Sequence, residues 1–356
     1  MTSRLAGVRG LLDALALDAV LVSAAVDVGY LSGFRGEDAV LVVSRDEALI
    51  CSDSRFWAQI REESPGFELV KTDELLDDAL RVVGERCGPT ARLGFQGGHL
   101  SYAAHRRVRR RFAGRLRNVG DRVSDLRQVK EAGEVECLRR AAAVTDGALA
   151  AAIAGGLEGR TEAEVAWAIE CAVREGGGEG SAFAPIVATA ERGALAHAIP
   201  GERRIARGDL VVIDCGARVE GYCSDITRTV AIGSAGEEER AVYEVVLTAQ
   251  SAGRAAVRAG VGGRAVDEAA RAVIRAAGHG DAFGHGTGHG VGLEVHEKPR
   301  LGKRHGDPLA AGMVCTVEPG IYLEGRFGVR IEDTVLVTAT GCETLTHFPR
   351  ELRIVA

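Results

Sequence analysis

The chain has 356 residues, of which 46% are hydrophobic and 26% are charged, so it can bury a large core and disorder is excluded. Its formal net charge of −6 gives no general attraction to nucleic acid or to anionic membranes, and we expect neither as a partner. At roughly 100–200 residues for each domain, this length predicts two domains.

The N-terminal segment and the cysteines favour a cytoplasmic protein. Residues Met1–Val20 predict an amphipathic helix interrupted by charges, without the continuous apolar core of a secretion signal. No stretch reaches the roughly 20 apolar residues that a membrane span requires. The eight cysteines are scattered without a CxxC pair, which predicts reduced, mostly buried thiols instead of a disulfide framework.

Helices and strands alternate in residues 1–127, which predicts an N-terminal α/β domain. The predicted elements are, in chain order, a strand at 19–22, a hairpin of strands at 39–43 and 48–51, and helices at 74–86 and 102–112. The hairpin is predicted because Ser44–Glu47, between its strands, is a good turn sequence. A domain boundary is expected near residues 125–129.

The remaining residues, 128–356, predict an α+β domain built from two similar halves. Residues 130–173 carry two long helical patterns, and Thr161 with Glu164 forms a capping box at the start of the second. The later elements are, in order, a hairpin at 210–232, a helical segment at about 237–277, a glycine-rich loop, and a hairpin at 313–337.

Two aspartates lie on the two strands of the first hairpin. An apolar run, residues 210–213, ends in Asp214, a turn follows at residues 218–221, and Asp225 lies on the returning strand. Because cross-strand neighbours are about 5 Å apart, both carboxylates can face one cavity. The alternative is that Asp214 caps a strand while Asp225 pairs with Arg228. Taken alone, this hairpin favours the alternative.

The second hairpin repeats the arrangement with glutamates. An apolar-leaning run leads to Glu318, and the returning strand, residues 329–335, carries Glu332. Because side chains alternate across a strand, Arg330, Glu332 and Thr334 share one face. An Arg-x-Glu sequence on a strand is usually a solvated ion pair, but two acid-bearing hairpins in one domain favour a shared site.

Between the hairpins, residues 284–292 have the sequence Gly-His-Gly-Thr-Gly-His-Gly-Val-Gly. Glycine at every other position excludes a regular helix and allows close backbone approach. No Gly-Lys-Ser/Thr follows, so this is not a phosphate loop. His285, His289 and His296 make this region rich in imidazole, the commonest nitrogen ligand of metals, and we expect a metal ligand here.

Four carboxylates and one histidine would form an oxygen-rich site that suits hard divalent cations. Acids that converge in one cavity repel one another unless cations neutralise them. Two cations about 3.5–4 Å apart, with bridging carboxylates, would do so, and a hydroxide between them would be a nucleophile at neutral pH. We therefore expect two divalent cations, Mn²⁺ in preference to Co²⁺ or Zn²⁺, bound by Asp214, Asp225, Glu318, Glu332 and one of these three histidines.

These segments resemble the motifs of the pita-bread metallopeptidases, within which the chain is similar to the Xaa-Pro aminopeptidase and Xaa-Pro dipeptidase (prolidase) branch. The resemblance spans about residues 129–356 and fills all five metal positions in order. It rests on His197, Ile213–Gly216, Gly221–Thr229, Gly288–Gly292, Val317–Gly320 and Val329–Thr334. It implies a pita-bread (creatinase/aminopeptidase-like) catalytic domain of α+β type after a smaller creatinase/prolidase-type α/β domain, which limits the cleft and builds a homodimer.

The resemblance also implies a role for each metal ligand. Asp214 would bind one cation, His289 would bind the other, and Asp225 with Glu332 would bridge the two. Glu318 would complete the site and act as the proton shuttle of the reaction.

Further residues would act on the substrate, a proline-containing peptide. His197 and His296 would contact it and stabilise the tetrahedral intermediate, with hydrogen-bond donors placed where charge develops. Thr227 would fix the orientation of the carboxylates. His285 and Arg330 would line the substrate-binding pocket, with Tyr322 nearby.

The implied activity is hydrolysis of an N-terminal Xaa-Pro bond. We favour an aminopeptidase, because residues 52–56 resemble the shorter bacterial aminopeptidases of this branch, and keep the dipeptidase as the alternative. A methionine aminopeptidase shares the five ligands but lacks the extra N-terminal domain. Creatinase-type hydrolases lack the full ligand set. A non-catalytic binding module on this fold is the alternative from another class, but such modules lose ligands.

Overall fold

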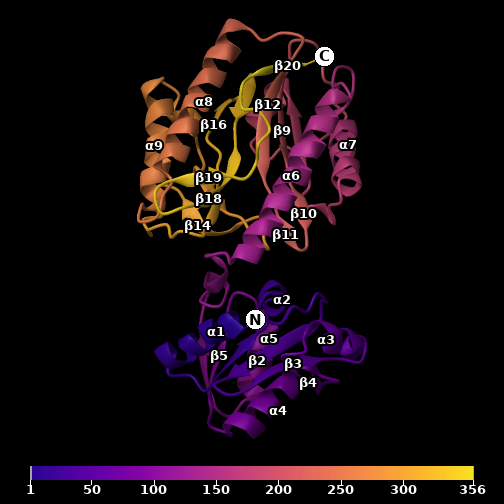
Figure 1. The fold of residues 1–356 in the computed structure, drawn as a ribbon, viewed down its shortest axis with the longest axis vertical. Helices are drawn as coiled ribbons and strands as arrows, with labels where there is room; N and C mark the ends of the chain where they lie inside the picture. Colours follow the sequence, from indigo (N-terminus) through magenta and orange to yellow (C-terminus); the bar gives the residue numbers. More distant parts are fainter. Residues whose placement is uncertain (1, 356) are drawn as a thin grey trace. The chain divides into compact units, whose positions relative to one another are not determined.

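A computed structural model describes residues 2–355, which divide into two compact units between Arg127 and Gln128. Each unit has its own sheets and helices (Figure 1). The first contains α1 (Thr2–Leu15), β1 (Ala19–Val22), α2 (Ala25–Ser32), β2 (Ala39–Ser44), β3 (Ala48–Ser52), α3 (Trp57–Glu63), β4 (Glu68–Lys71), α4 (Leu75–Cys87), β5 (Arg92–Phe95), α5 (Tyr102–Arg111), β6 (Arg115–Asn118) and the 3₁₀ turn η1 (Ser124–Arg127).

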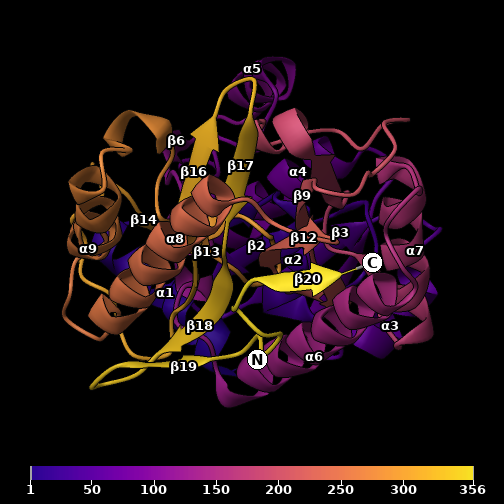
Figure 2. The same cartoon turned by 90° about the horizontal axis from the view of Figure 1, so that it is seen from above.

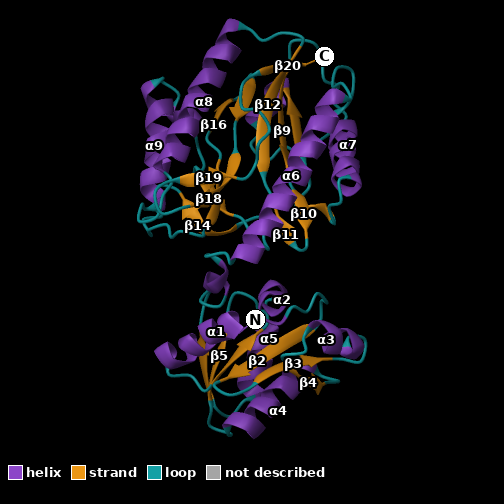
Figure 3. Ribbon diagram, in the orientation of Figure 1, coloured by secondary structure: helices purple, strands orange, loops and turns teal. Residues whose placement is uncertain are grey.

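The first unit is a six-stranded sheet in the order β4-β3-β2-β1-β5-β6, with helices on its faces (Figure 3). Its central strand β1 is buried along its whole length, as an apolar run bounded by helices predicts. The predicted β2–β3 hairpin is confirmed, and its turn is closed by a hydrogen bond from Glu47 N–H to the hydroxyl of Ser44 at 3.1 Å. Both predicted helices, α4 and α5, are also confirmed.

The prediction of one helix over residues 1–20 is wrong in its extent. The helix ends at Leu15, and Ala19 and Val20 already belong to β1, where they pair with β2. The small Ala19 and the β-branched Val20 are both fully buried in the sheet. β-Branched side chains pack well against the neighbouring strands of a sheet. Met1 lies outside the described residues.

A buried ion pair ties the end of the first unit to α2. Arg127 Nε lies 2.9 Å from Oδ1 of Asp27, and both side chains are almost completely buried. The other carboxylate oxygen of Asp27 accepts hydrogen bonds from Gln96 at 2.5 Å and Ser124 at 2.7 Å. These contacts hold the last turn of the unit against α2 and against Gln96, the residue after β5.

The second unit holds four helices and the remaining strands of the described chain. They are α6 (Ala132–Ala154), α7 (Glu162–Glu175), β7 (Gly180–Ser181), β8 (Ile186–Thr189), η2 (Ala190–Ala194), β9 (Leu210–Cys215), β10 (Ala217–Val219), β11 (Tyr222–Cys223), β12 (Ile226–Ile232), α8 (Glu237–Ala256), α9 (Gly263–Ala276), η3 (Gly280–Ala282), β13 (Gly288–Gly290), β14 (Glu297–Leu301), β15 (Val314–Val317), β16 (Gly320–Leu323), β17 (Phe327–Arg330), β18 (Asp333–Val337), β19 (Cys342–Thr344) and β20 (Arg353–Val355).

The two predicted halves are present in this unit. The helix pair α6–α7 accompanies a four-stranded sheet, β20-β12-β9-β8, and the pair α8–α9 accompanies a five-stranded sheet, β14-β13-β15-β18-β19. The strands lie between the two helix pairs (Figure 3), and α8 lies against β16 and β17 (Figure 2). The capping box is confirmed, since Thr161 and Glu164 exchange hydrogen bonds at 2.7 and 3.1 Å.

The returning strands of both hairpins are interrupted, contrary to the prediction of continuous strands. The first breaks between β11 and β12 at Asp225, and the second breaks between β17 and β18 at Glu332. At these points the backbone bonds to the other sheet: Glu332 N–H donates to the carbonyl of Thr227, and the carbonyl of Asp225 accepts from the hydroxyl of Thr334. Both breaks therefore fall at acids of the candidate site.

All eight cysteines lie within the described residues and are free thiols, as predicted. Burial raises the pKa of the Cys315 thiol to about 12, so this thiol is unreactive at neutral pH. Among residues 2–355, no helix combines the length and the apolar character needed to cross a membrane.

Candidate metal centre

Asp214 and Asp225 meet because β9 and β12 pair in antiparallel register. Thr227 lies opposite Asp214, so Asp225, two residues before Thr227, lies diagonally across from Asp214 on the same face. Arg228 forms its ion pair with Asp333 at 2.8 Å instead of with Asp225. The alternative that Asp225 is merely the partner of Arg228 is therefore wrong.

Glu318 follows β15 directly, and its position is held by main-chain and side-chain bonds. Its N–H donates to the carbonyl of Thr287 at 2.8 Å, and the hydroxyl of Thr316 donates to its carboxylate at 3.2 Å. Glu332 is almost fully buried in the gap before β18. Both glutamates face the cavity that the two aspartates face.

His289 lies on β13, in a segment that glycine allows to pass close to other backbone. A Cβ at Gly288 would lie 2.0 Å from the carbonyl oxygen of Thr316, and a Cβ at Gly290 would lie 2.2 Å from that of Lys298. No other residue fits at these two positions without moving the strand. The glycines therefore fix the strand that carries His289 between its neighbours.

The imidazole of His289 presents one nitrogen to the acids. Its Nδ1 lies 3.1 Å from the carbonyl oxygen of Gly290, which can only accept, so Nδ1 carries the proton and Nε2 offers its lone pair. Nε2 lies 3.3 Å from Oε1 of Glu318 and 3.7 Å from Oδ2 of Asp225. Burial lowers the pKa of this imidazole to about 4, which keeps the ring neutral at pH 7.

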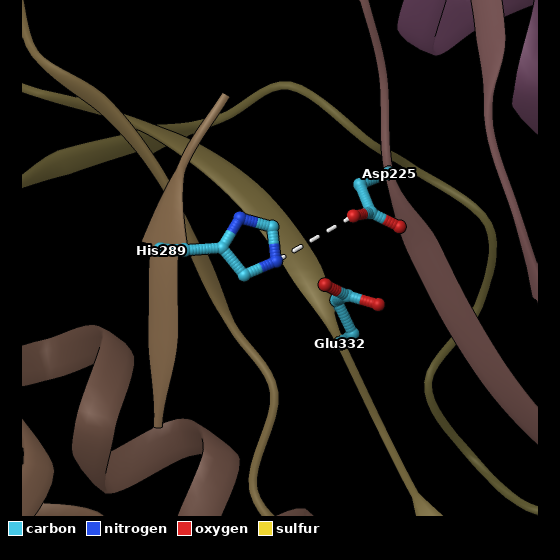
Figure 4. Close-up of side chains that lie close together, drawn as sticks. All are labelled: Asp225, His289 and Glu332. Atoms are coloured by element: carbon cyan, nitrogen blue, oxygen red, sulfur yellow. Dashed lines mark ion pairs between the residues drawn. The ribbon is translucent and has the colours of Figure 1, made fainter. Parts of the chain in front are cut away.

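Ligand atoms of Asp225, His289 and Glu332 lie within 4.8 Å of one another, an arrangement able to hold a metal ion (Figure 4). Asp214 and Glu318 line the same cavity, whose volume is about 720 Å³. The structure thus brings together all five side chains that the sequence predicts as metal ligands.

The environment of the buried acids favours either protonation of their carboxylates or the binding of cations to them. Burial, followed by repulsion from Glu332 and Asp214, raises the pKa of Asp225 well above its ordinary range. Burial and repulsion from Glu318 do the same to the pKa of Glu332. Burial also raises the pKa of Glu318. A divalent cation would remove this repulsion.

A further observation indicates that these donors fit divalent cations. Within the described chain, Oδ1 of Asp214 and Oε1 of Glu332 are buried and have no hydrogen-bond partner. Buried carboxylate oxygens without partners are costly unless a cation or water meets them. Oxygen donors with one imidazole suit Mn²⁺ better than thiolate-preferring metals.

Arg330 and Thr227 connect the acids behind the cavity. Arg330 donates to Oδ2 of Asp214 at 2.6 Å and to the hydroxyl of Thr227 at 2.9 Å. The hydroxyl of Thr227 donates in turn to Oε2 of Glu332 at 2.6 Å. Arg330 lines the cavity, as predicted, although most of its donors are already used by the protein.

The predicted substrate-contacting histidines all line the cavity. His197 is exposed on the loop after η2, and the ring of His296 lies 4.1 Å from that of His289. His285 forms a 2.9 Å hydrogen bond with the hydroxyl of Tyr322. Among the described residues, Tyr322 stands outside the set that lines the cavity, and it supports His285 and Arg330 from behind.

A basic group of cavity residues was missed by the sequence reasoning. Arg300 lies opposite His289 in the β13–β14 pair, and Lys303, Arg304 and His305 follow it along the cavity wall. The run from Lys298 to His305 looks like an ordinary solvated charge cluster. This basic group could have been predicted only by recognising that residues 297–301 form a strand that pairs with the histidine segment.

Comparison with known proteins agrees with this geometry. The model of metallopeptidase family M24 matches residues 136–339, and the model of the creatinase/prolidase N-terminal domain matches residues 4–129. An Xaa-Pro dipeptidase of Pyrococcus furiosus is 38% identical over 356 residues, covering 99% of this chain and 100% of the relative.

Two solved structures extend the comparison. The solved structure of an Xaa-Pro dipeptidase from Bacillus anthracis is 36% identical, with 99% of both chains covered, and superposes with a TM-score of 0.96. The solved structure of an X-Pro aminopeptidase from Thermotoga maritima is 38% identical, covers 96% of this chain and 98% of the other, and has a TM-score of 0.88. The pita-bread catalytic fold predicted from the sequence is thereby confirmed.

Proposed function

The chain belongs to metallopeptidase family M24, and we propose that within this family it is an Xaa-Pro dipeptidase that uses two divalent cations. The observation that carries this proposal is the convergence of Asp225, His289 and Glu332, with Asp214 and Glu318 in the same cavity. The relatives named dipeptidases support the substrate class. The aminopeptidase activity that the sequence favours is supported less well by these relatives than the dipeptidase activity.

The proposed assignment of ligands is the one that the family resemblance implies. Asp214 and His289, which both line the cavity, would each bind one cation, and Asp225 and Glu332 would bind both. When bound, the cations supply Lewis-acid activation of water and of the scissile carbonyl. We propose Mn²⁺ as the cation, because the donors are oxygens with a single imidazole.

Glu318 is the proposed carrier of the proton. Its pKa is raised by burial, so the carboxyl holds a proton more readily than an exposed glutamate, and Thr316 fixes one of its oxygens. It can pass the proton to the departing proline nitrogen. That nitrogen belongs to a tertiary amide and has no proton of its own in the substrate.

The histidines are the proposed substrate contacts. His197 and His296 line the cavity from different elements and can donate hydrogen bonds where the carbonyl oxygen gains charge. His285, held by Tyr322 at 2.9 Å, would orient the substrate. Each of these roles rests on position in the cavity.

The basic wall of the cavity favours a dipeptide over a longer peptide. In a dipeptide the proline carries the free carboxylate, so an anion lies one residue from the scissile bond. Arg300, which lies opposite His289, and Lys303 and Arg304 offer positive charge on the cavity wall. A guanidinium pairs well with a carboxylate, whereas a longer peptide would place a neutral amide there.

An Xaa-Pro aminopeptidase is the second candidate, favoured by the similarity to the Thermotoga maritima structure. Assays of Ala-Pro and Ala-Pro-Ala with added Mn²⁺ distinguish the two. We expect Ala-Pro to be cleaved with a much higher kcat/KM. Comparable cleavage of the tripeptide would favour the aminopeptidase. Cleavage of Met-Ala peptides alone would move the assignment to a methionine aminopeptidase.

The homodimer and the cleft-limiting role of residues 1–127 are also proposals. They come from the resemblance to the creatinase/prolidase N-terminal domain. Light scattering of the purified protein tests the dimer directly, and a mass of one chain would reject it.

A further inference from the structure

The two acids proposed to bridge the cations belong to different sheets. Asp225 precedes β12 of the four-stranded sheet, and Glu332 precedes β18 of the five-stranded sheet. The distance between the two carboxylates therefore depends on how the beginnings of these two strands are joined. One backbone hydrogen bond, from Glu332 N–H to the carbonyl of Thr227 at 3.1 Å, contributes to the joint.

Side chains supply further links across this joint. The hydroxyl of Thr334 donates to the carbonyl of Asp225 at 2.8 Å. The hydroxyl of Thr229 in β12 holds the end of β17, two residues before Glu332: it donates to the carbonyl of Arg330 at 3.0 Å and accepts from its N–H at 3.1 Å. Arg228 donates to the carbonyls of Thr227, at 2.9 Å, and Glu332. We call Arg228, Thr229 and Thr334 the seam.

Arg228 is the central member of the seam. It is among the largest fully buried side chains, and Nη2 forms a 2.8 Å ion pair with Asp333. Its Nε donates to the carbonyl of Pro349 at 2.9 Å, and Nε and Nη2 also donate to that of Phe348. With donors fixed on three chain segments, this planar group cannot rotate without losing several bonds at once.

Asp333 is itself held in place. Its Oδ2 accepts from Gln250 at 2.8 Å and lies 2.7 Å from Nε of Arg350. The carboxylate is fully buried, so its position is set by these partners and by Arg228. The ion pair thus anchors Asp333, the residue after Glu332, and Arg228, which lies three residues after Asp225.

From these contacts we propose that Arg228, anchored by Asp333, is a positioning residue that sets the spacing of the Asp225 and Glu332 carboxylates and so determines binding of the second cation. The inference rests on the proposed two-cation site. Arg228 contacts the main chain of Glu332 and no reacting atom. A wrong spacing would leave one cation bound and weaken the other, because both cations share these two carboxylates.

The test is the variant Arg228→Lys, which keeps the charge but loses the planar fork of donors. We expect the Mn²⁺ affinity for the second ion to fall by about 10–100-fold, as losses around metal ligands typically do. The paramagnetic resonance signal of a coupled Mn²⁺ pair should give way to that of single ions. The kcat for Ala-Pro should fall by about 10–100-fold, with KM changed by less than about 3-fold.

The matched control is Arg127→Lys, which disturbs another buried arginine–aspartate pair, with Asp27, in the N-terminal unit. It should lower Tm but leave the Mn²⁺ content, the resonance signal and kcat unchanged. If Arg228→Lys behaves as this control does, with a lower Tm and two ions bound at wild-type affinity, the proposal is overturned.

If circular dichroism shows that Arg228→Lys does not fold, the variant Asp333→Asn decides. It keeps the shape of the side chain but removes the charge that anchors Arg228, and we expect the second-ion affinity to fall roughly tenfold or more, the equivalent of one hydrogen bond to a charged group. Unchanged affinity in this variant overturns the proposal. A wild-type protein that binds only one ion would overturn the proposed two-cation function as well, so the two failures are distinguishable.

Discussion

The hydroxyl of Thr227 donates a 2.6 Å hydrogen bond to Oε2 of Glu332 and itself accepts a 2.9 Å hydrogen bond from Arg330. One carboxylate oxygen of Glu332 is thereby fixed by the protein. The other, Oε1, is left buried and without a protein partner. A single hydroxyl therefore decides which oxygen of this acid is available to a cation.

The variant Thr227→Val should weaken metal binding and turnover by roughly 10–100-fold, because Glu332 would be free to rotate away from the cations. Titration with Mn²⁺, followed by calorimetry, measures the effect. The control is Thr189→Val, which removes a buried hydroxyl on β8 from its 2.9 Å bond with Asp209. Equal losses in the two variants would show that Thr227 acts only on stability.

Replacement of Glu318 should remove both proton transfer and a metal donor. We expect Glu318→Ala to lower kcat by about 10²–10⁴-fold or more and to weaken metal retention. Glu318→Gln keeps the shape and should retain metal better while remaining inactive. Metal content after dialysis and steady-state assays measure the two effects. Near-normal rates in either variant would remove Glu318 from its proposed role.

Loss of His197 should affect turnover without affecting the cations, because this exposed residue lies outside the donor cluster. We expect His197→Ala to lower kcat/KM by about 10²-fold or more, as for other donors to a developing oxyanion. The Mn²⁺ content should stay at the wild-type value. A variant that lost metal instead would assign His197 to the metal centre.

Arg300 should matter most for substrates with a carboxylate on proline. We expect Arg300→Met to lower kcat/KM for Ala-Pro by roughly tenfold or more, mainly through KM, since a charge-assisted hydrogen bond is lost. Ala-Pro-amide, which lacks the charge, serves as the control substrate and should lose much less. Equal losses for both substrates would argue that Arg300 supports the position of His289 and does not bind the carboxylate of the substrate.

Removal of metal should make stability depend on pH in a defined direction. The folded-state pKa values of Asp225, Glu332 and Glu318 are raised, so their contribution is fully present below about pH 4 and is lost as pH rises through the raised values. His289, with its folded pKa lowered to about 4, acts oppositely between its folded value and about 6.5.

Above about pH 6.5 the carboxyl effect therefore acts without opposition from His289. Melting curves of chelator-treated protein should show Tm falling as pH rises from 6.5 to 8.5. Added Mn²⁺ should restore Tm, and the increase should be larger at pH 8 than at pH 5.5, because protons compete with the cation. A metal-free Tm that rose over this range would contradict the raised carboxyl pKa values.

Much of the site could be predicted because its donors follow short, apolar segments of sequence. Asp214 is the penultimate residue of β9 and Glu318 follows β15, each directly after a buried run of the kind that signals a strand. His289 stands out because glycine surrounds it. In these cases local pattern and final position agree.

The breaks in the returning strands could not be predicted in the same way. Asp225 and Glu332 leave their strands because each bonds to a segment more than one hundred residues away, through Thr334 and Thr227. No local signal marks such a contact. Arg300 was missed for a related reason, since only the pairing of β13 with β14 turns an ordinary charged run into a cavity wall.

The tight packing around β13 has a consequence for surveys of random variants. An added methyl group at residue 288 or residue 290 would meet a carbonyl oxygen within about 2 Å and displace the imidazole between them. In a selection for activity, alanine at either position should therefore be as rare as replacement of the metal donors themselves. Intolerance to substitution along this strand would then mark crowding and not chemistry.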